Sequence, residues 1–313
     1  MGKKQMKWFL AVSVVLIAAL LAATALIEQP DEQMSSMPLA LSFEYHFAIN
    51  IGSPDTSFAE QFLAGAEQEA QKWNVALEVA ELNSAYADND TPFEVWADYC
   101  NMDAIIVSAA PSAKESSLEP FSAIPCISIR NDALPDSSAY VGSDNYQVGY
   151  DLGEALCKKG MNLTAALLLP EKEDQAVSST LKGLYDALDA GKTVTIVDTL
   201  YTESDLLTAM SAVETLLLSP NGSPDYILCL DETLISGAVR GIIDLNRVNS
   251  VDVAGIGYSD EIETYIQSGI VQITVNTDPF RMGELAVQTA VRACRGELDT
   301  AAQEYLIPHT VVS

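Results

Sequence analysis

The sequence predicts an α/β protein whose parallel strands form two sheets. From Tyr45 onward, short runs rich in β-branched residues and bounded by turn residues alternate with longer amphipathic runs, which is typical of βαβ units. About nine such strands are more than one open sheet of this size usually carries. The 313 residues, 49% of them hydrophobic and 19% charged, are enough for one large or two medium domains with cores of their own.

The start of the chain has the pattern of an export segment. Three lysines precede residues 8–27, a stretch that has no charged side chain and is about as long as a membrane-spanning helix. Residues 1–27 are therefore either a signal peptide, cleaved near the small residues 23–25, or an uncleaved membrane anchor formed by an apolar helix. Both alternatives place the rest of the chain outside the cytoplasm. The polar residues 28–40 are expected to form a tether.

The first strand and the first helix of the body are predicted from their side-chain patterns. Residues 45–51 (YHFAINI) are rich in aromatic and apolar residues and precede a loop with glycine and proline, which favours a strand. In residues 59–73, apolar side chains from Phe62 to Trp73 recur at intervals of three and four. This spacing predicts a helix with one apolar stripe facing a sheet.

The remaining elements follow in the same alternation. Short apolar runs predict strands at residues 76–81, 104–108, 126–129, 163–168, 193–199, 226–230, 253–256 and 273–276. Apolar residues at helical spacing predict the connecting helices at residues 146–159, 175–190, 206–218, 233–245 and 282–295. The chain is expected to leave the first sheet near residues 141–145, where a short strand ends in turn-forming residues.

Charge and cysteine spacing limit the partners of the protein. Sixteen Lys and Arg against 44 Asp and Glu give a net charge of −28, and such a surface repels nucleic-acid phosphates and anionic lipid headgroups. The five cysteines show neither a CxxC pair nor zinc-ligand spacing, so they are predicted to be structural and unpaired. The acidic turn 88–90 lacks the spacing of a calcium loop. We expect no nucleic-acid partner, no metal and no cofactor.

A series of short motifs follows along the body of the chain. They are residues 51–58 (IGSPDTSF), 65–70 (GAEQEA), 103–108 (DAIIVS), 124–129 (IPCISI), 141–149 (VGSDNYQVG), 225–232 (DYILCLDE), 253–257 (VAGIG) and 276–283 (NTDPFRMG). In this order the motifs resemble those of the type I periplasmic binding proteins, the family of ribose- and galactose-type solute receptors. The resemblance spans residues 41–313.

The resemblance implies two doubly wound lobes that are joined by a three-crossing hinge and hold a ligand between them. It places residues 41–143 and 278–306 in the N-terminal lobe, and residues 144–277 and 307–313 in the C-terminal lobe. Independently, ligands of open α/β sheets bind beyond the carboxyl ends of the strands, where loops and helix N-termini converge. Closure of two hinged lobes buries such a ligand and changes the shape that a membrane partner meets.

Ten residues in these loops are candidate ligand contacts. They are Asp55, Ser57, Phe58, Ser108, Arg130, Asn131, Asp231, Tyr258, Asn276 and Thr277. Phe58 is expected either to stack on a ligand or to pack on the first helix. Tyr258 either stacks, donates its hydroxyl or lies on the rim, and Asp231 either contacts ligand or caps a helix.

The candidate site departs from the hexose-binding pattern of the family. Ser57 stands where a second aromatic is common, and Arg130 with Asn131 stands where sugar binders often have an Asp-Arg pair. Other polar positions of the pattern are occupied by Thr180, Leu230, Gly257 and Thr277. A standard pyranose is therefore not expected, and the ligand class is a sugar or sugar derivative. Arg130 either grips a carboxylate, phosphate or other acceptor-rich group, or pairs with an acidic residue such as Asp132.

The sequence predicts a binding protein and not an enzyme. Neither His46 nor His309 has a catalytic motif around it, and the chain contains no GxSxG, Walker, HExxH or GxGxxG sequence. A transcription regulator of related fold would begin with a basic helix-turn-helix, whereas this chain begins with its export segment. Two functions stay open. One is a substrate-binding protein that presents a solute to an ABC permease, and the other is a membrane-anchored sensor that partners a histidine kinase or other signalling receptor.

Overall fold

The computed structural model describes residues 43–51, 56–79, 100–108, 124–130, 137–171, 175–220, 222–298 and 303–313. The predicted export segment, residues 1–27, and the predicted tether, residues 28–40, lie outside these ranges, so both stay predictions. In the described ranges, no helix combines the length and the apolar character needed to cross a membrane.

The first sheet has six strands. They are β1 (Tyr45–Asn50), β2 (Val75–Val79), β3 (Ala104–Ser108), β4 (Cys126–Ile129), β5 (Ala139–Gly142) and β11 (Gln303–Leu306), in the order β11-β5-β4-β3-β1-β2. Every neighbouring pair in this order is parallel. The inner strands β3, β4 and β5 are buried throughout and mostly apolar, as a sheet covered on both faces requires, whereas the edge strands β2 and β11 carry exposed residues.

The second sheet also has six strands. They are β6 (Leu163–Pro170), β7 (Val194–Thr202), β8 (Tyr226–Cys229), β9 (Asp252–Ile256), β10 (Val271–Asn276) and β12 (Thr310–Val312), in the order β12-β10-β9-β8-β6-β7. Only the pair of β10 and β12 is antiparallel. The predicted α/β class with two parallel-sheet lobes is confirmed.

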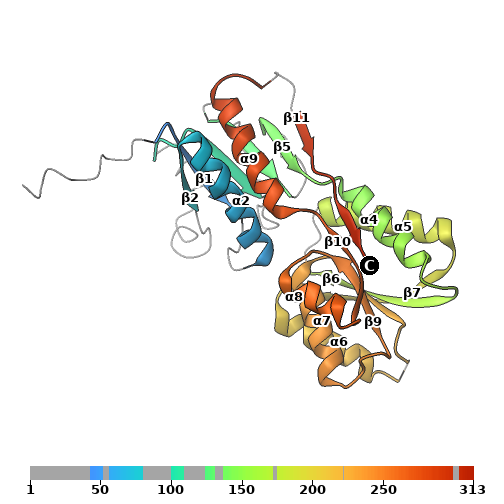
Figure 1. The fold of residues 1–313 in the computed structure, drawn as a ribbon. Coiled ribbons are helices and arrows are strands. Elements are labelled where there is room, and N and C mark those ends of the chain that lie inside the picture. The colour runs from blue at the N-terminus through green and yellow to red at the C-terminus, as the bar shows by residue number, and fades with distance from the viewer. Residues whose placement is uncertain are drawn as a thin grey trace, which may run out of the picture. The chain divides into compact units, whose positions relative to one another are not determined.

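Helices cover the sheets. In the first lobe, α2 (Ser57–Trp73) and α9 (Pro279–Cys294) pack side by side against the sheet (Figure 1). In the second lobe, α4 (Asn145–Cys157) and α5 (Gln175–Gly191) share one core. A second core on that sheet contains α6 (Leu206–Leu218), α7 (Glu232–Asp244) and α8 (Asp260–Gln267).

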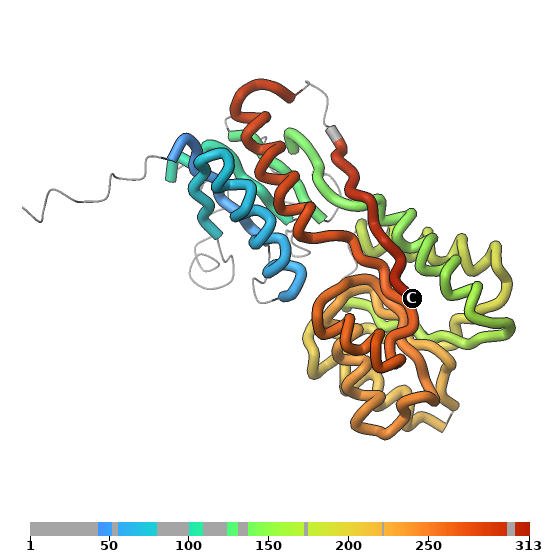
Figure 2. The backbone as a smooth tube through the Cα atoms, in the orientation of Figure 1, coloured from blue at the N-terminus to red at the C-terminus, as the bar shows by residue number. Residues whose placement is uncertain are grey.

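The chain passes between the two sheets three times, as the resemblance implied. It runs from β5 into α4, from β10 into α9, and from β11 directly into β12, a path that the tube in Figure 2 follows. The first of these passages lies where the sequence predicted it, near residues 141–145. The finer boundaries of the lobes, 41–143 with 278–306 and 144–277 with 307–313, stay predictions.

Three elements were not predicted. The strands β11 and β12 have four and three residues, too few to show a period along the sequence, whereas β5 is the short strand expected to end near residues 141–145. Helix α8 has three acidic residues in its first turn and only Ile262 fully buried, so its apolar stripe is short. The predicted elements match the observed ones with ends that differ by a few residues, which is the usual uncertainty of helix and strand ends.

Two glycines let α2 and α9 approach each other closely. A Cβ atom on Gly65 would lie 2.0 Å from the carbonyl oxygen of Phe280, and one on Gly283 would lie 2.0 Å from the carbonyl oxygen of Phe62. Because glycine has no side chain, each helix can contact the backbone of the other at this position. This contact fixes α2, whose first turn carries Ser57 and Phe58.

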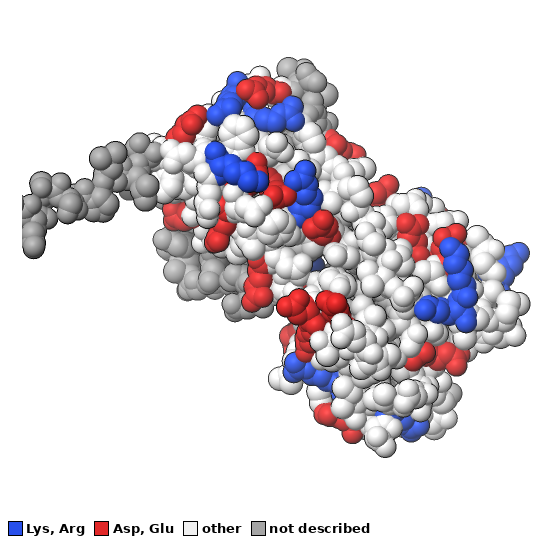
Figure 3. Space-filling model, viewed as in Figure 1, with Lys and Arg blue, Asp and Glu red and all other residues white. Residues whose placement is uncertain are grey.

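Three positive side chains at the surface form short ion pairs with acidic residues of their own helices. Lys72 lies 2.7 Å from Glu69, Arg281 lies 2.7 Å from Glu284, and Lys158 lies 2.8 Å from Glu154. On the face shown in Figure 3, basic and acidic side chains are interspersed. Because acidic residues greatly outnumber basic ones in the sequence, the protein keeps a negative field that favours cations over anions.

Candidate functional site

The carboxyl ends of β1, β3 and β4 lie next to one another in the first sheet. The strand register pairs Asn50 with Val107 and Ser108 with Ile129, so that Arg130 directly follows the end of β4 beside Ser108. Asn50 and Ser108 are polar and buried, at 4% and 9% exposure. This edge therefore offers polar groups at the place where open α/β sheets bind their ligands.

Arg130 is held over the ring of Phe58. Its backbone is left-handed, with φ of 64°, and the hydroxyl of Tyr140 donates to its carbonyl oxygen at 3.3 Å. The guanidinium carbon lies 4.6 Å from the centroid of the Phe58 ring, within the range of a cation–π interaction. A guanidinium stacked on a ring keeps its N–H donors in its own plane, where an acceptor can reach them.

Phe58 also packs on the first lobe. Its ring is nearly parallel to that of Phe62, with centroids 6.2 Å apart and an interplanar angle of 19°, and it borders the core of the first sheet. The alternative in which Phe58 packs on the first helix is therefore realised. Its ring forms a support for Arg130, and its contact with a ligand stays a prediction.

Loops after β8, β9 and β10 form the corresponding edge of the second sheet. Asp231 follows β8, Tyr258 follows β9, and Asn276 ends β10 with Thr277 after it. The Asn276 side-chain oxygen accepts a hydrogen bond from the backbone N–H of Asp278 at 2.8 Å. The structure thus places these four predicted residues at strand ends, with Asn276 already engaged in the turn that starts α9.

Asp231 caps α7. The backbone N–H of Leu234 donates to its carboxylate at 2.8 Å, and the backbone of Asp231 is extended, as an N-cap requires. Replacement by alanine is expected to lower the free energy of unfolding by about 1 kcal/mol, measured by chemical denaturation. Asp231→Asn should retain wild-type stability, because asparagine caps equally well. A large loss of ligand affinity in Asp231→Asn would instead assign the carboxylate to the ligand.

Tyr258 contacts its own lobe through its side chain and the other lobe through its backbone. Partial burial raises the pKa of its hydroxyl, and the carboxylate of Glu263 adds to this rise. Its carbonyl oxygen accepts a hydrogen bond from the side-chain amide of Gln61 on α2 at 2.7 Å. The same amide donates to the hydroxyl of Ser57 at 3.1 Å. Gln61 therefore connects the first turns of α2 with the loop after β9.

Glu232 is the site residue that the sequence did not reveal. It is half-buried in the first turn of α7. Burial raises the pKa of its carboxyl, while hydrogen bonding to the hydroxyls of Ser57 and Ser259, and the charge of Arg130, oppose this rise. Ser57 and Arg130 belong to the first lobe, and Ser259 to the second. An acidic residue in a first helical turn ordinarily indicates only a favourable helix dipole, and nothing in the sequence links position 232 to Ser57.

Two of the ten predicted contacts cannot be placed. Asp55 and Asn131 lie outside the described residues, as does Asp132, the alternative partner of Arg130. Of the others, the structure stacks Arg130 on Phe58, next to Ser57, and Gln61 connects this group with the loop that carries Tyr258. Ser108, Asn276 and Thr277 lie at the ends of β3 and β10.

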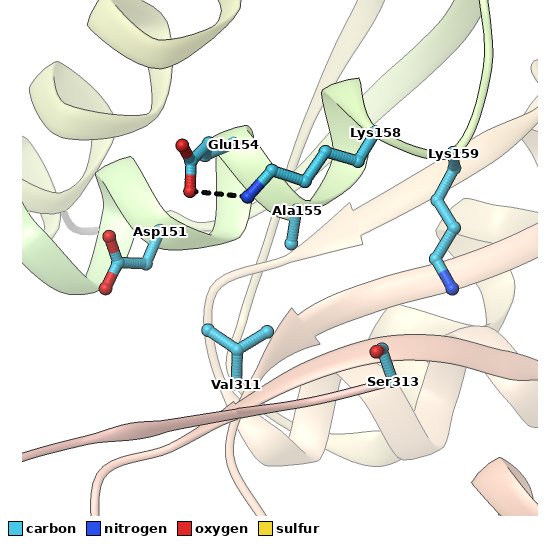
Figure 4. A pocket seen from close by; sticks show the side chains of 7 residues that line it. All are labelled: Asp151, Glu154, Ala155, Lys158, Lys159, Val311 and Ser313. Carbon is cyan, nitrogen blue, oxygen red and sulfur yellow. Dashed lines mark hydrogen bonds and ion pairs between the residues drawn. The ribbon is translucent and has the colours of Figure 1, made fainter.

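A pocket of about 570 Å³ lies elsewhere, against α4 and β12 (Figure 4). Its lining residues are Asp151, Glu154, Ala155, Lys158, Lys159, Val311 and Ser313. No predicted contact belongs to this set, and Lys158 is neutralised by Glu154. The polar groups that converge from two lobes, and not this pocket, make the candidate site.

The chain forms two parallel-sheet lobes and passes between them three times, and polar side chains lie at the strand ends of both lobes. These features define a two-lobed α/β binding protein. The periplasmic binding protein domain family matches residues 47–298, and the chain belongs to this family. Its members bind solutes and are not enzymes, so this chain is not an enzyme. Membership also implies an extracytoplasmic location.

Known proteins of similar sequence and structure cover most of the chain. The ribose import binding protein RbsB of Haemophilus influenzae is 24% identical over 257 residues, which are 80% of this chain and 86% of the relative. The crystal structure of GanP, a glucose-galactose binding protein from Geobacillus stearothermophilus, has a TM-score of 0.74 at 24% identity and covers 86% of this chain and 96% of its own. An ABC transporter solute-binding protein from Burkholderia graminis, in complex with D-arabinose, has a TM-score of 0.77 at 19% identity, with 87% and 96% covered.

Proposed function

We propose that this protein captures a small sugar or sugar-derived molecule between its lobes and presents it to an ABC transporter. The observation that carries the proposal is the group of Arg130, stacked on Phe58, and Ser57 in the first lobe, which Gln61 connects to Tyr258 in the second lobe, next to Glu232. The names of the similar proteins support the ligand class, since they include ribose, glucose, galactose and arabinose. The similar Burkholderia protein is an ABC transporter solute-binding protein, which supports the transport role.

The cluster suits a ligand that both donates and accepts hydrogen bonds. Arg130 supplies N–H donors on the support of Phe58, and Glu232 supplies acceptor oxygens. A sugar hydroxyl has one O–H and two lone pairs, so it matches both groups. We infer that Ser108, Asn276 and Thr277, with Asp55 and Asn131 from the adjoining loops, provide further contacts when the ligand is bound.

Closure of the lobes supplies the signal to the membrane partner. The side-chain amide of Gln61, which donates to the hydroxyl of Ser57 and to the carbonyl oxygen of Tyr258, joins the lobes beside the proposed ligand. A ligand that contacts both sides favours the joined arrangement by the difference between its affinities for the open and closed states. The alternative of a membrane-anchored sensor partnering a signalling kinase is favoured by no observation on the described residues.

A thermal-shift screen of the purified body tests the proposal. Pentoses, hexoses, polyols, sugar acids and amino sugars are the probes. A ligand present at 100 times its dissociation constant is expected to stabilise the protein by about 2.7 kcal/mol, which corresponds to roughly 5 to 10 °C for a domain of this size. If no member of these classes raises the melting temperature, the proposed ligand class is wrong. Amino acids, peptides and nucleosides serve as control ligands.

A further inference from the structure

Glu232 lies beside a contact between the lobes. A Cβ atom on Gly257 would lie 2.8 Å from the Cβ of Glu232, and the next residue, Tyr258, accepts a hydrogen bond from Gln61 of the other lobe at 2.7 Å. The carboxylate of Glu232 is half-buried; burial raises its pKa, and the neutral hydroxyls of Ser57 and Ser259 oppose that rise. Among the described Lys, Arg and His side chains, those that form ion pairs pair with other acids, and none lies within 4.0 Å of Glu232. A partly buried carboxylate is costly unless a donor, and above all a cation, compensates it.

Arg130 acts on Glu232 from the opposite lobe without touching it. Its charge stabilises the ionised carboxylate, yet the two side chains are farther apart than an ion pair. The guanidinium is retained over Phe58 instead. The two lobes therefore present opposite charges to the place where the ligand is proposed to bind, and a ligand that fits between them donates to Glu232 and accepts from Arg130.

We propose that the ligand is a polyhydroxylated molecule with a basic amine, whose ammonium group binds Glu232 and whose hydroxyl oxygens accept from Arg130. This inference rests on the proposed function and specifies its ligand class. An ammonium group both donates hydrogen bonds and neutralises Glu232, whereas a neutral hydroxyl leaves the charge in place. A sugar acid or sugar phosphate gains at Arg130 but is repelled by Glu232, by the neighbouring Asp231 and by the net negative field of the protein.

The experiment compares matched ligands by isothermal titration calorimetry at neutral pH and constant ionic strength. The probes are D-glucosamine with D-glucose, D-galactosamine with D-galactose, and the N-acetyl derivative of each amino sugar, which keeps the substituent but removes its charge. For at least one pair, the amine is expected to bind roughly 10-fold or more tightly than the parent sugar and the N-acetyl derivative, as a charge-assisted hydrogen bond predicts.

Three variants assign the preference to Glu232. Glu232→Gln should lose roughly 10- to 100-fold in affinity for the amine and little for the parent sugar. Glu232→Asp keeps the charge and should retain a preference for the amine. Asp260→Asn is the matched control, since it removes an exposed carboxylate at the first turn of the next helix in the same lobe, and it should bind like the wild type. The melting temperature of each unliganded variant establishes that it is folded.

The outcomes separate this inference from the function on which it rests. An amine preference that Glu232→Gln abolishes supports both. Parent sugars that bind as tightly as their amines, or an amine preference that persists in Glu232→Gln, overturn the inference and leave the sugar-binding function in place. If neutral, acidic and amino sugars all fail to bind the wild type, the proposed ligand class falls and this inference falls with it.

Discussion

Gly65→Ala is expected to lower the free energy of unfolding by about 3 kcal/mol, at the upper end of ordinary overpacking effects. The new Cβ would lie 2.0 Å from the carbonyl oxygen of Phe280, so a helix backbone would have to move to make room. Alanine is otherwise the better helix former, and an isolated helix would be stabilised by this change. The melting temperature should fall by roughly 6 to 12 °C.

Gly160→Ala is the control for this substitution. A Cβ on Gly160 would have the side chain of Leu163 as its nearest neighbour, at 3.3 Å, and a side chain can adjust where a backbone cannot. Its melting temperature should stay within about 1 °C of the wild type. A Gly65→Ala protein as stable as this control would show that α2 and α9 do not need their close contact.

Arg130→Gly is expected to abolish most ligand binding while leaving stability nearly unchanged. Glycine removes the guanidinium and at the same time relieves a left-handed backbone, with φ of 64°, which costs a non-glycine residue about 1–2 kcal/mol. The lost cation–π contact with Phe58 offsets part of that gain, by about 0.5–1 kcal/mol. The free energy of unfolding should therefore change by less than about 1 kcal/mol, whereas the affinity for the ligand found by the screen should fall roughly 10- to 100-fold.

Arg130→Lys separates the shape of the guanidinium from its charge. Lysine keeps the positive charge but loses the planar fork and its stacking on the ring, so an intermediate affinity is expected. Calorimetry with the ligand, together with chemical denaturation, provides both measurements. Wild-type affinity in Arg130→Gly would remove Arg130 from the binding site and favour its alternative role as the partner of an acidic loop residue.

Much of the fold could be predicted because its signals are local. Strands such as β3 and β4 are continuous apolar runs bounded by turn residues, and α6 has the predicted bounds. The short strands β11 and β12 are different, since three or four residues show no period. Their existence depends on neighbours far along the chain, β5 and β10, that supply hydrogen-bonding partners.

The candidate site was predicted in part for the same reason. Strand ends can be read from the sequence, which is why Ser57, Phe58 and Arg130 were named as candidates. The structure brings Arg130 over Phe58, and their contact with a ligand stays a prediction. The stacking of Arg130 on Phe58 joins residues 72 positions apart, and no periodicity encodes such a pair. The capping role of Asp231 was one of two predicted alternatives; the structure shows the cap, and contact of Asp231 with a ligand stays a prediction.

By itself, the sequence determined the class of the protein: an acidic α/β chain of alternating strands and helices with no motif for catalysis, metal or nucleic acid. These properties follow from composition and from spacing within single elements, which a chain carries before it folds. Only the tertiary structure decided that Glu232, beside Gly257, lies next to the contact that Gln61 makes between Ser57 and Tyr258. This proximity depends on how the two separate sheets bring their strand ends together. The pKa of Glu232 is shifted by burial and by charged residues, of which Arg130 is distant in the chain.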